Sequence, residues 1–83
     1  IGYQFAFIGY ANLKQWDNAA AVCDKYLELE PADAALREKC GEVCLYRNDP
    51  AGAIRQVNIL EKLGQKERAD RLRTSVADYK KDQ

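Results

Sequence analysis

Apolar residues recur along the chain at intervals of three and four, the spacing that places them on one face of an α-helix. No stretch alternates apolar and polar residues with the two-residue period of a β-strand. Only two prolines and five glycines interrupt the pattern. The sequence therefore predicts an all-α fold of five helices, over about 2–14, 17–29, 34–47, 50–63 and 66–80.

Residues that favour helix ends mark several of these boundaries. Asp17, Asp33 and Asp49 each precede an apolar-periodic segment and are expected to cap its N-terminus. Pro50 would then occupy the first position of the fourth helix, where a missing N–H costs nothing. Gly64 is expected to end the same helix by adopting the left-handed conformation.

A shift of 34 residues brings two of the predicted helices into register. The apolar residues that coincide are Ala19, Ala20, Cys23, Tyr26 and Leu29 with Ala53, Ile54, Val57, Leu60 and Leu63. Each set follows one face of a helix. We therefore predict a helix–turn–helix unit used twice, over about 1–31 and 34–64, followed by a single capping helix over about 66–81.

The residues that recur in this way also match a known motif. They are Tyr3, Tyr10, Trp16, Ala19, Cys23, Tyr26 and Pro31 in the first unit, and Cys40, Gly41, Cys44, Ala53, Val57 and Leu60 in the second. In these residues the sequence resembles the tetratricopeptide repeat family. The resemblance implies antiparallel helix pairs stacked as a short right-handed α-solenoid, a single domain over 1–83 that forms the C-terminal part of a longer array. The small residues Gly41 and Ala53 would let the two helices of the second unit approach closely.

Composition removes several classes of function. The 83 residues include 13 basic and 13 acidic side chains, so there is no net positive charge to attract nucleic acid. The absence of histidine excludes Ser–His and Cys–His nucleophile arrangements within this chain. No apolar run approaches the roughly 20 residues that cross a bilayer. We therefore expect a binding protein rather than an enzyme, with no cofactor, no nucleic-acid partner and no membrane span.

The three cysteines allow more than one state. Cys40 and Cys44 are four residues apart on one predicted helix face, and Cys23 could approach them from the neighbouring helix. A metal site is disfavoured because there is no fourth cysteine, no histidine and no CxxC motif. We favour buried cysteines that act as small apolar residues over a disulfide such as Cys23–Cys40. Both states leave the compartment open, either a reducing cytosol, which is slightly favoured, or an oxidising space.

The resemblance also implies a binding surface. In this family the first helix of each unit lines a concave groove, in which a segment of a partner protein or peptide lies. The corresponding residues here are Gln4, Ile8, Asn12, Glu38, Glu42, Leu45 and Tyr46. We interpret Glu38 and Glu42 as a solvated helix face first, and as partner-binding residues second. Because carboxylates repel one another, an acidic C-terminal tail is not the expected partner.

Aromatic residues crowd the first predicted helix. Tyr3, Phe5 and Phe7 are expected to form a face that docks a partner, a preceding repeat or a second copy of the chain. This face supports an alternative to the interaction scaffold, namely a structural subunit of a larger complex. Trp16 is expected to pack over the turn between its own two helices rather than to bind a partner. The basic residues between 66 and 73 alternate with acidic ones, as is typical of a solvated helix face.

Overall fold

A computed structural model describes the backbone of residues 2–82 and the side chains of residues 6–79. It contains the helices α1 (Gly2–Asn12), α2 (Trp16–Leu29), α3 (Ala34–Tyr46), α4 (Pro50–Lys62) and α5 (Lys66–Asp82). The predicted all-α fold of five helices is confirmed. Over this described part of the chain, no helix is both long enough and apolar enough to span a membrane.

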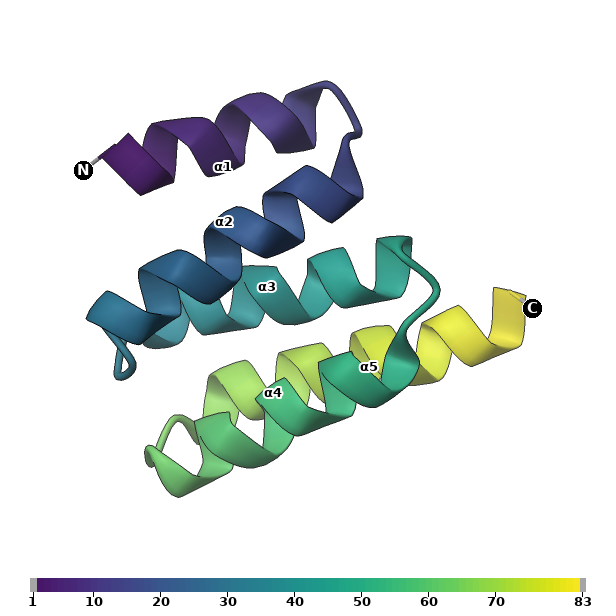
Figure 1. Cartoon of the computed structure of the whole chain (residues 1–83). Helices are drawn as coiled ribbons and strands as arrows, with labels where there is room; N and C mark the ends of the chain where they lie inside the picture. The colour runs from purple at the N-terminus through teal and green to yellow at the C-terminus, as the bar shows by residue number, and fades with distance from the viewer. Residues whose placement is uncertain (1, 83) are drawn as a thin grey trace.

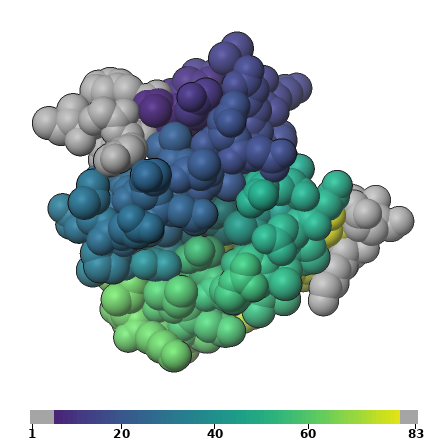
Figure 2. Space-filling model, viewed as in Figure 1, coloured from purple at the N-terminus to yellow at the C-terminus, as the bar shows by residue number. Residues whose placement is uncertain are grey.

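Successive helices pack against one another in chain order, and α3 also packs against α5. In Figure 1, α2 and α4 lie in front of α3 and α5. The space-filling view in the same orientation shows α2 and α4 covering much of the visible surface, with α5 seen only at the margins (Figure 2). The Cα atoms span 32 × 30 × 16 Å. The shortest dimension therefore holds two helix layers at the usual separation of about 8–10 Å.

Side-chain caps define the starts of α3 and α4. The Asp33 carboxylate accepts a hydrogen bond from the Leu36 N–H at 3.1 Å, and the Asp49 carboxylate accepts one from the Gly52 N–H at 3.0 Å. Each cap satisfies a backbone donor that has no partner within its helix. Gly64, after the end of α4, is left-handed with φ of 77°. The sequence-based prediction is confirmed at all three sites.

The predicted cap at Asp17 is wrong. The helix α2 begins one residue earlier, at Trp16, and its N-cap is Gln15, which makes no side-chain cap. The preceding residue, Lys14, is left-handed with φ of 58° and turns the chain sharply into the helix. Asp17 therefore lies in the first turn of α2, where its carboxylate accepts a hydrogen bond from Arg47.

The turns before α2 and α4 share one backbone geometry. Lys14 and Asn48, 34 positions apart, are both left-handed, with φ of 58° and 62°. The Lys14 N–H donates to the Ala11 carbonyl at 3.0 Å, and the Asn48 N–H makes the equivalent bond to Leu45 at 3.0 Å. Gly64 repeats this pattern at the turn before α5. The three turns therefore share one backbone conformation although their left-handed residues differ in type.

Each of these three turns is followed by an alanine with no exposed surface. Ala19, Ala53 and Ala69 all have 0% exposure. Each alanine lies five positions after the left-handed residue of its turn and is the fourth residue of the new helix. A small side chain suits a fully buried position of this kind, because a larger one would overpack the core.

The core lies on both sides of α3. Buried residues on the α2 side are Phe7, Ala19, Cys23, Leu36, Cys40 and Val43, and those on the α4 and α5 side are Leu45, Ala53, Val57, Leu60, Ala69, Leu72 and Val76. Phe7 is only 7% exposed, so its predicted place on an exposed docking face is wrong. It is buried because side chains of α2 and α3 cover it. The side chains of Tyr3 and Phe5 lie outside the described residues.

Gly41 allows a close approach, but to a different helix from the one predicted. A Cβ atom at Gly41 would overlap Cδ2 of Leu72 on α5. The close contact between α3 and α4 lies instead at Gly52, where a Cβ atom would be 2.9 Å from the Cys44 Sγ. The prediction is wrong for Gly41, which faces α5, because α3 packs against two later helices rather than one; Ala53 is fully buried in a cluster with Leu45 of α3.

A disulfide joins Cys23 of α2 to Cys40 of α3, with the two Cα atoms 5.9 Å apart. Both residues are buried in the core, as predicted. The favoured prediction of unbonded thiols is wrong for this pair, since α2 and α3 pack side by side and bring the two side chains together. Cys44 is a free cysteine, and burial raises the pKa of its thiol.

Candidate partner-binding groove

One face of α3 carries a continuous stripe of exposed side chains. Its members are Ala35, Lys39, Glu42 and Tyr46, spaced by three and four residues. Glu42 and Tyr46 are two of the predicted groove residues, and Tyr46 is 63% exposed. The stripe borders two pockets, one toward α1 and one toward α5.

The first pocket, of about 280 Å³, opens between α1 and the N-terminal half of α3. It is lined by Phe7, Ile8, Asp33, Ala35, Leu36 and Lys39. Ile8, a predicted groove residue, is 50% exposed and lies at this pocket. Asn12 is exposed at the end of α1 but does not line it. The Gln4 side chain lies outside the described residues.

The second pocket, of about 300 Å³, opens between the C-terminal half of α3 and α5. Its lining residues are Glu42, Leu45, Tyr46, Ser75, Asp78 and Tyr79. Three predicted groove residues therefore meet here. Leu45 is mostly buried and belongs to the core cluster that Tyr79 packs against. The Tyr79 hydroxyl donates a hydrogen bond to the Asn48 side chain, which fixes the position of the tyrosine ring.

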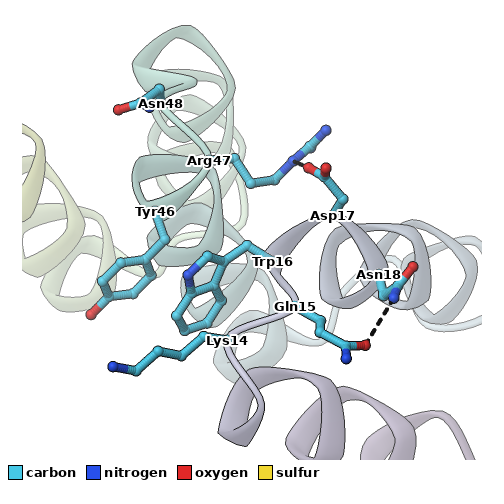
Figure 3. Close-up of a pocket in the computed structure, with 8 residues that line it drawn as sticks. All are labelled: Lys14, Gln15, Trp16, Asp17, Asn18, Tyr46, Arg47 and Asn48. Carbon is cyan, nitrogen blue, oxygen red and sulfur yellow. Dashed lines mark hydrogen bonds and ion pairs between the residues drawn. The ribbon is translucent and has the colours of Figure 1, made fainter.

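Trp16 stacks against Tyr46 at the edge of this pocket. The ring centroids are 4.4 Å apart and the ring planes differ by 14° (Figure 3). Such a stacked pair contributes about 0.5–1.5 kcal/mol beyond the burial of its surface. Trp16 is thus a packing residue, as predicted, but its partner lies at the end of α3 rather than within its own helix pair. The stack holds the Tyr46 ring in place from one side.

A third pocket, of about 520 Å³, surrounds this stack and is lined by residues 14–18 and 46–48 (Figure 3). The Arg47 Nε lies 2.8 Å from the Asp17 Oδ1. The Asn18 amide donates to the Gln15 side-chain carbonyl at 3.0 Å. These four polar groups are satisfied by one another, which leaves Lys14 as the charged lining residue without an ion pair among the described side chains.

Glu38 is not a solvated groove residue. Its side chain is only 12% exposed and accepts hydrogen bonds from Arg68 at 3.1 Å and from Arg71 at 2.9 Å. The hydrogen bond from Arg71, assisted by Arg68, holds the pKa of Glu38 below its ordinary value. The interpretation as a solvated face is wrong here because α5 packs against α3 and supplies both guanidinium groups.

Glu42, one turn further along α3, has a different environment. It is exposed, and it makes no hydrogen bond or ion pair with any side chain described in the structure. Surrounding protein atoms remove part of its hydration, which raises its pKa, and the nearby charge of Glu38 raises it further. Lys39 and Arg71 partly offset both effects. The expectation of an exposed carboxylate is confirmed for Glu42.

The contribution of α5 to this site is not apparent from the sequence. Ser75, Asp78 and Tyr79 form one wall of the α3–α5 pocket, although α5 was interpreted as a cap with a solvated back. No local sequence signal indicates this wall, because the pairing of Arg71 with Glu38 joins positions 33 apart. Once that pairing is known, Ser75 and Glu42 follow it by one helical turn on their own helices and are expected to be neighbours.

Comparison of the chain with protein-family models, with curated proteins and with solved structures finds no match. No relative therefore supplies a function, and what the groove can do follows from its own side chains. Among the side chains that the structure describes, no group of three or more cysteines, aspartates or glutamates is arranged to hold a metal ion.

Proposed function

We propose that the chain is a protein-interaction scaffold of the tetratricopeptide type, a short right-handed solenoid that forms one domain and the C-terminal part of a longer array. A segment of a partner protein lies along its first helices α1, α3 and α5. The observation that carries this proposal is that pockets open between successive first helices, at α1–α3 and at α3–α5, along one exposed stripe of α3. The recurrence of turn geometry at 34 positions supports the repeat architecture.

The arrangement suits binding better than catalysis. The groove side chains belong to packed helices, and α3 is covered on both of its sides. Little conformational freedom is therefore lost when a partner is bound. The chain has no histidine to act as a general acid or base at neutral pH. The exposed tyrosine and isoleucine of the groove, Tyr46 and Ile8, are residue types that contribute apolar contact area to a partner.

A second candidate function has its own observation. On α1 and in the turn that follows it, Ile8 and Leu13 are 50% and 68% exposed, and the space beside Gly9 is open. A second copy or another subunit could cover this apolar surface permanently, as expected for a structural subunit. Sedimentation equilibrium separates the two functions, because a structural subunit held through α1 self-associates and a peptide-binding scaffold stays monomeric.

The proposed groove is tested by selecting binders from a random dodecapeptide display library on the folded chain. Selection is repeated on an Ile8→Ser/Tyr46→Ser variant, which changes both groove pockets. The matched control is Leu29→Ser/Ile54→Ser, which changes two other exposed apolar residues, both on the second helices. Peptides that bind the parent and the control but not the groove variant support the proposal. Peptides that bind all three equally, or no peptides at all, contradict it.

A further inference from the structure

The contact between α3 and α5 has two chemically different ends. At one, called the closed end, a carboxylate is paired with arginines; at the other, called the open end, the carboxylates have no such pairing. At the closed end, Glu38 of α3 pairs with Arg68 and Arg71 of α5. At the open end, α3 presents Glu42, whereas α5 presents Ser75 and Asp78. The next turn of α5 therefore brings the Ser75 hydroxyl where an arginine would pair with Glu42, and the turn after it brings a second carboxylate, Asp78.

No described side chain pairs directly with the carboxylates at this open end, although Lys39 and Arg71 lie close enough to Glu42 to lower its pKa in part. The Ser75 hydroxyl donates to the Arg71 carbonyl of its own helix at 3.3 Å. Neither Glu42 nor Asp78 has a hydrogen bond or an ion pair with a side chain between residues 6 and 79. Two carboxylates thus line one pocket whose lining includes no cationic side chain.

The other walls of the pocket are aromatic and apolar. Tyr46 is held by its stack on Trp16, and Tyr79 is held by the hydrogen bond from its hydroxyl to Asn48. Leu45 adds an aliphatic surface between them. Aromatic faces attract cations, and the long alkyl stem of a lysine or arginine packs on apolar walls while its charged end reaches carboxylates. The pocket therefore combines the contacts that a basic side chain makes along its whole length.

We propose that the α3–α5 pocket receives a lysine or arginine side chain from the bound partner segment, with its cationic group at Glu42 and Asp78 and its alkyl stem against Leu45, Tyr46 and Tyr79. This inference rests on the proposed groove and specifies the chemistry of its occupant. The partner supplies at the open end what Arg68 and Arg71 supply to Glu38 at the closed end. The raised pKa of Glu42 is in keeping with a carboxylate that lacks such a partner.

The same dodecapeptide selection tests this proposal through the sequences it yields. We expect lysine or arginine to be enriched at one fixed position among groove-dependent peptides. Replacing that residue with glutamine in a synthetic peptide should weaken binding about fivefold, the upper range for a solvent-accessible ion pair. The Glu42→Gln/Asp78→Asn variant should bind the basic and the glutamine peptide almost equally, as measured by titration calorimetry.

A matched control separates local pairing from net charge. The variant Asp24→Asn/Glu28→Gln removes two exposed carboxylates from α2 and changes the total charge by the same amount. It should keep the full preference for the basic peptide. In addition, selection on Glu42→Lys should replace the basic preference with an acidic one. Circular dichroism verifies that each variant is folded.

The outcomes distinguish this proposal from the groove itself. Groove-dependent peptides without a basic preference would overturn the proposed occupant but not the proposed scaffold function. A basic preference that Asp24→Asn/Glu28→Gln abolishes as fully as Glu42→Gln/Asp78→Asn does would have the same meaning. A failure to select any groove-dependent peptide would overturn both. Selected peptides that carry acidic residues at the fixed position on the parent chain would also exclude a basic occupant.

Discussion

Glu38 and Glu42 are the same residue type on neighbouring turns of one helix, yet they differ in almost every physical respect. Glu38 is 12% exposed, bound by two arginines, and has a lowered pKa. Glu42 is exposed, without such a partner among the described side chains, and has a raised pKa. The difference arises largely from α5, which brings Arg68 and Arg71 to Glu38 and Ser75 to the pocket at Glu42, while the charge of Glu38 itself adds to the raised pKa of Glu42.

This comparison separates residues that hold the fold from residues that are available to a partner. A carboxylate that already has two guanidinium groups contributes to the packing of α3 on α5, and a charge reversal there disturbs the fold. A carboxylate without a partner can be changed with little effect on stability, because its charge interacts mainly with water. Substitutions at Glu42 therefore report on binding, whereas those at Glu38 report on folding.

The largest effect on stability is expected on the other side of α3, at the disulfide. Reduction of Cys23–Cys40 should lower the free energy of unfolding by about 3 kcal/mol, because a loop of this length is no longer closed in the unfolded chain. Urea denaturation with and without a reductant measures this, and Cys44→Ala prevents thiol exchange during the experiment. Equal midpoints in the two conditions would contradict it.

The next largest effect is expected at Gly41, which lies between the two carboxylates. Gly41→Ala should destabilise the chain by about 1–2 kcal/mol, since the new methyl group meets the buried Leu72 side chain. Gly9→Ala is the matched control, because its Cβ meets nothing within 4 Å. It should stabilise α1 by about 0.5–1 kcal/mol through helix propensity. Urea denaturation should thus show a lower free energy of unfolding for Gly41→Ala and a higher one for Gly9→Ala. A change of the same sign in both variants would refute the close packing at Gly41.

Glu38→Gln removes the ion pairs at the closed end of the α3–α5 contact. We expect a loss of about 1 kcal/mol, a modest value because Arg68 and Arg71 remain accessible to water. The folded pKa of Glu38 lies below its unfolded value, so its contribution is present at neutral pH and is lost as acid protonates the folded carboxylate. Unfolding free energies measured down to about pH 2 should show this loss in the parent and not in the variant. Parallel curves would contradict the pairing.

Glu42→Gln should have the smallest effect, a change in stability below about 0.5 kcal/mol. Its sign should be slightly stabilising at neutral pH, because the folded pKa lies above the unfolded value and the charged form is penalised in the fold. A carboxyl NMR titration of the parent sharpens the comparison directly. Glu42 should protonate at higher pH than Glu38, and the reverse order would show that the open end is neutralised.

The helices were predictable because their signals are local. Asp33, Asp49 and Pro50 lie at helix starts, and the apolar period between them identifies the helices that they begin. The cap at Asp17 failed because a left-handed residue that is not glycine, Lys14, started the helix early. Side-chain preference alone gives no indication of that turn. Local patterns therefore locate helices to within a residue or two.

The site was less predictable because its contacts join distant parts of the chain. Glu38 meets arginines 30 and 33 positions away, and nothing in the spacing of α3 indicates that α5 lies beside it. The same holds for Trp16 and Tyr46, which stack across two helix pairs. The cysteine pattern allowed a bridge between Cys23 and Cys40, but only the packing of α2 on α3 brings the two sulfurs together.

That bridge also has a mechanical consequence. It spans 17 positions of the chain and ties α2 to α3, while α1, α4 and α5 lie outside the loop that it closes. A chain drawn out by its two ends can extend everywhere except within this loop, which withholds about 50 Å of length. The extended chain therefore has two maximum lengths, the shorter one while the disulfide is intact and the longer one after its reduction.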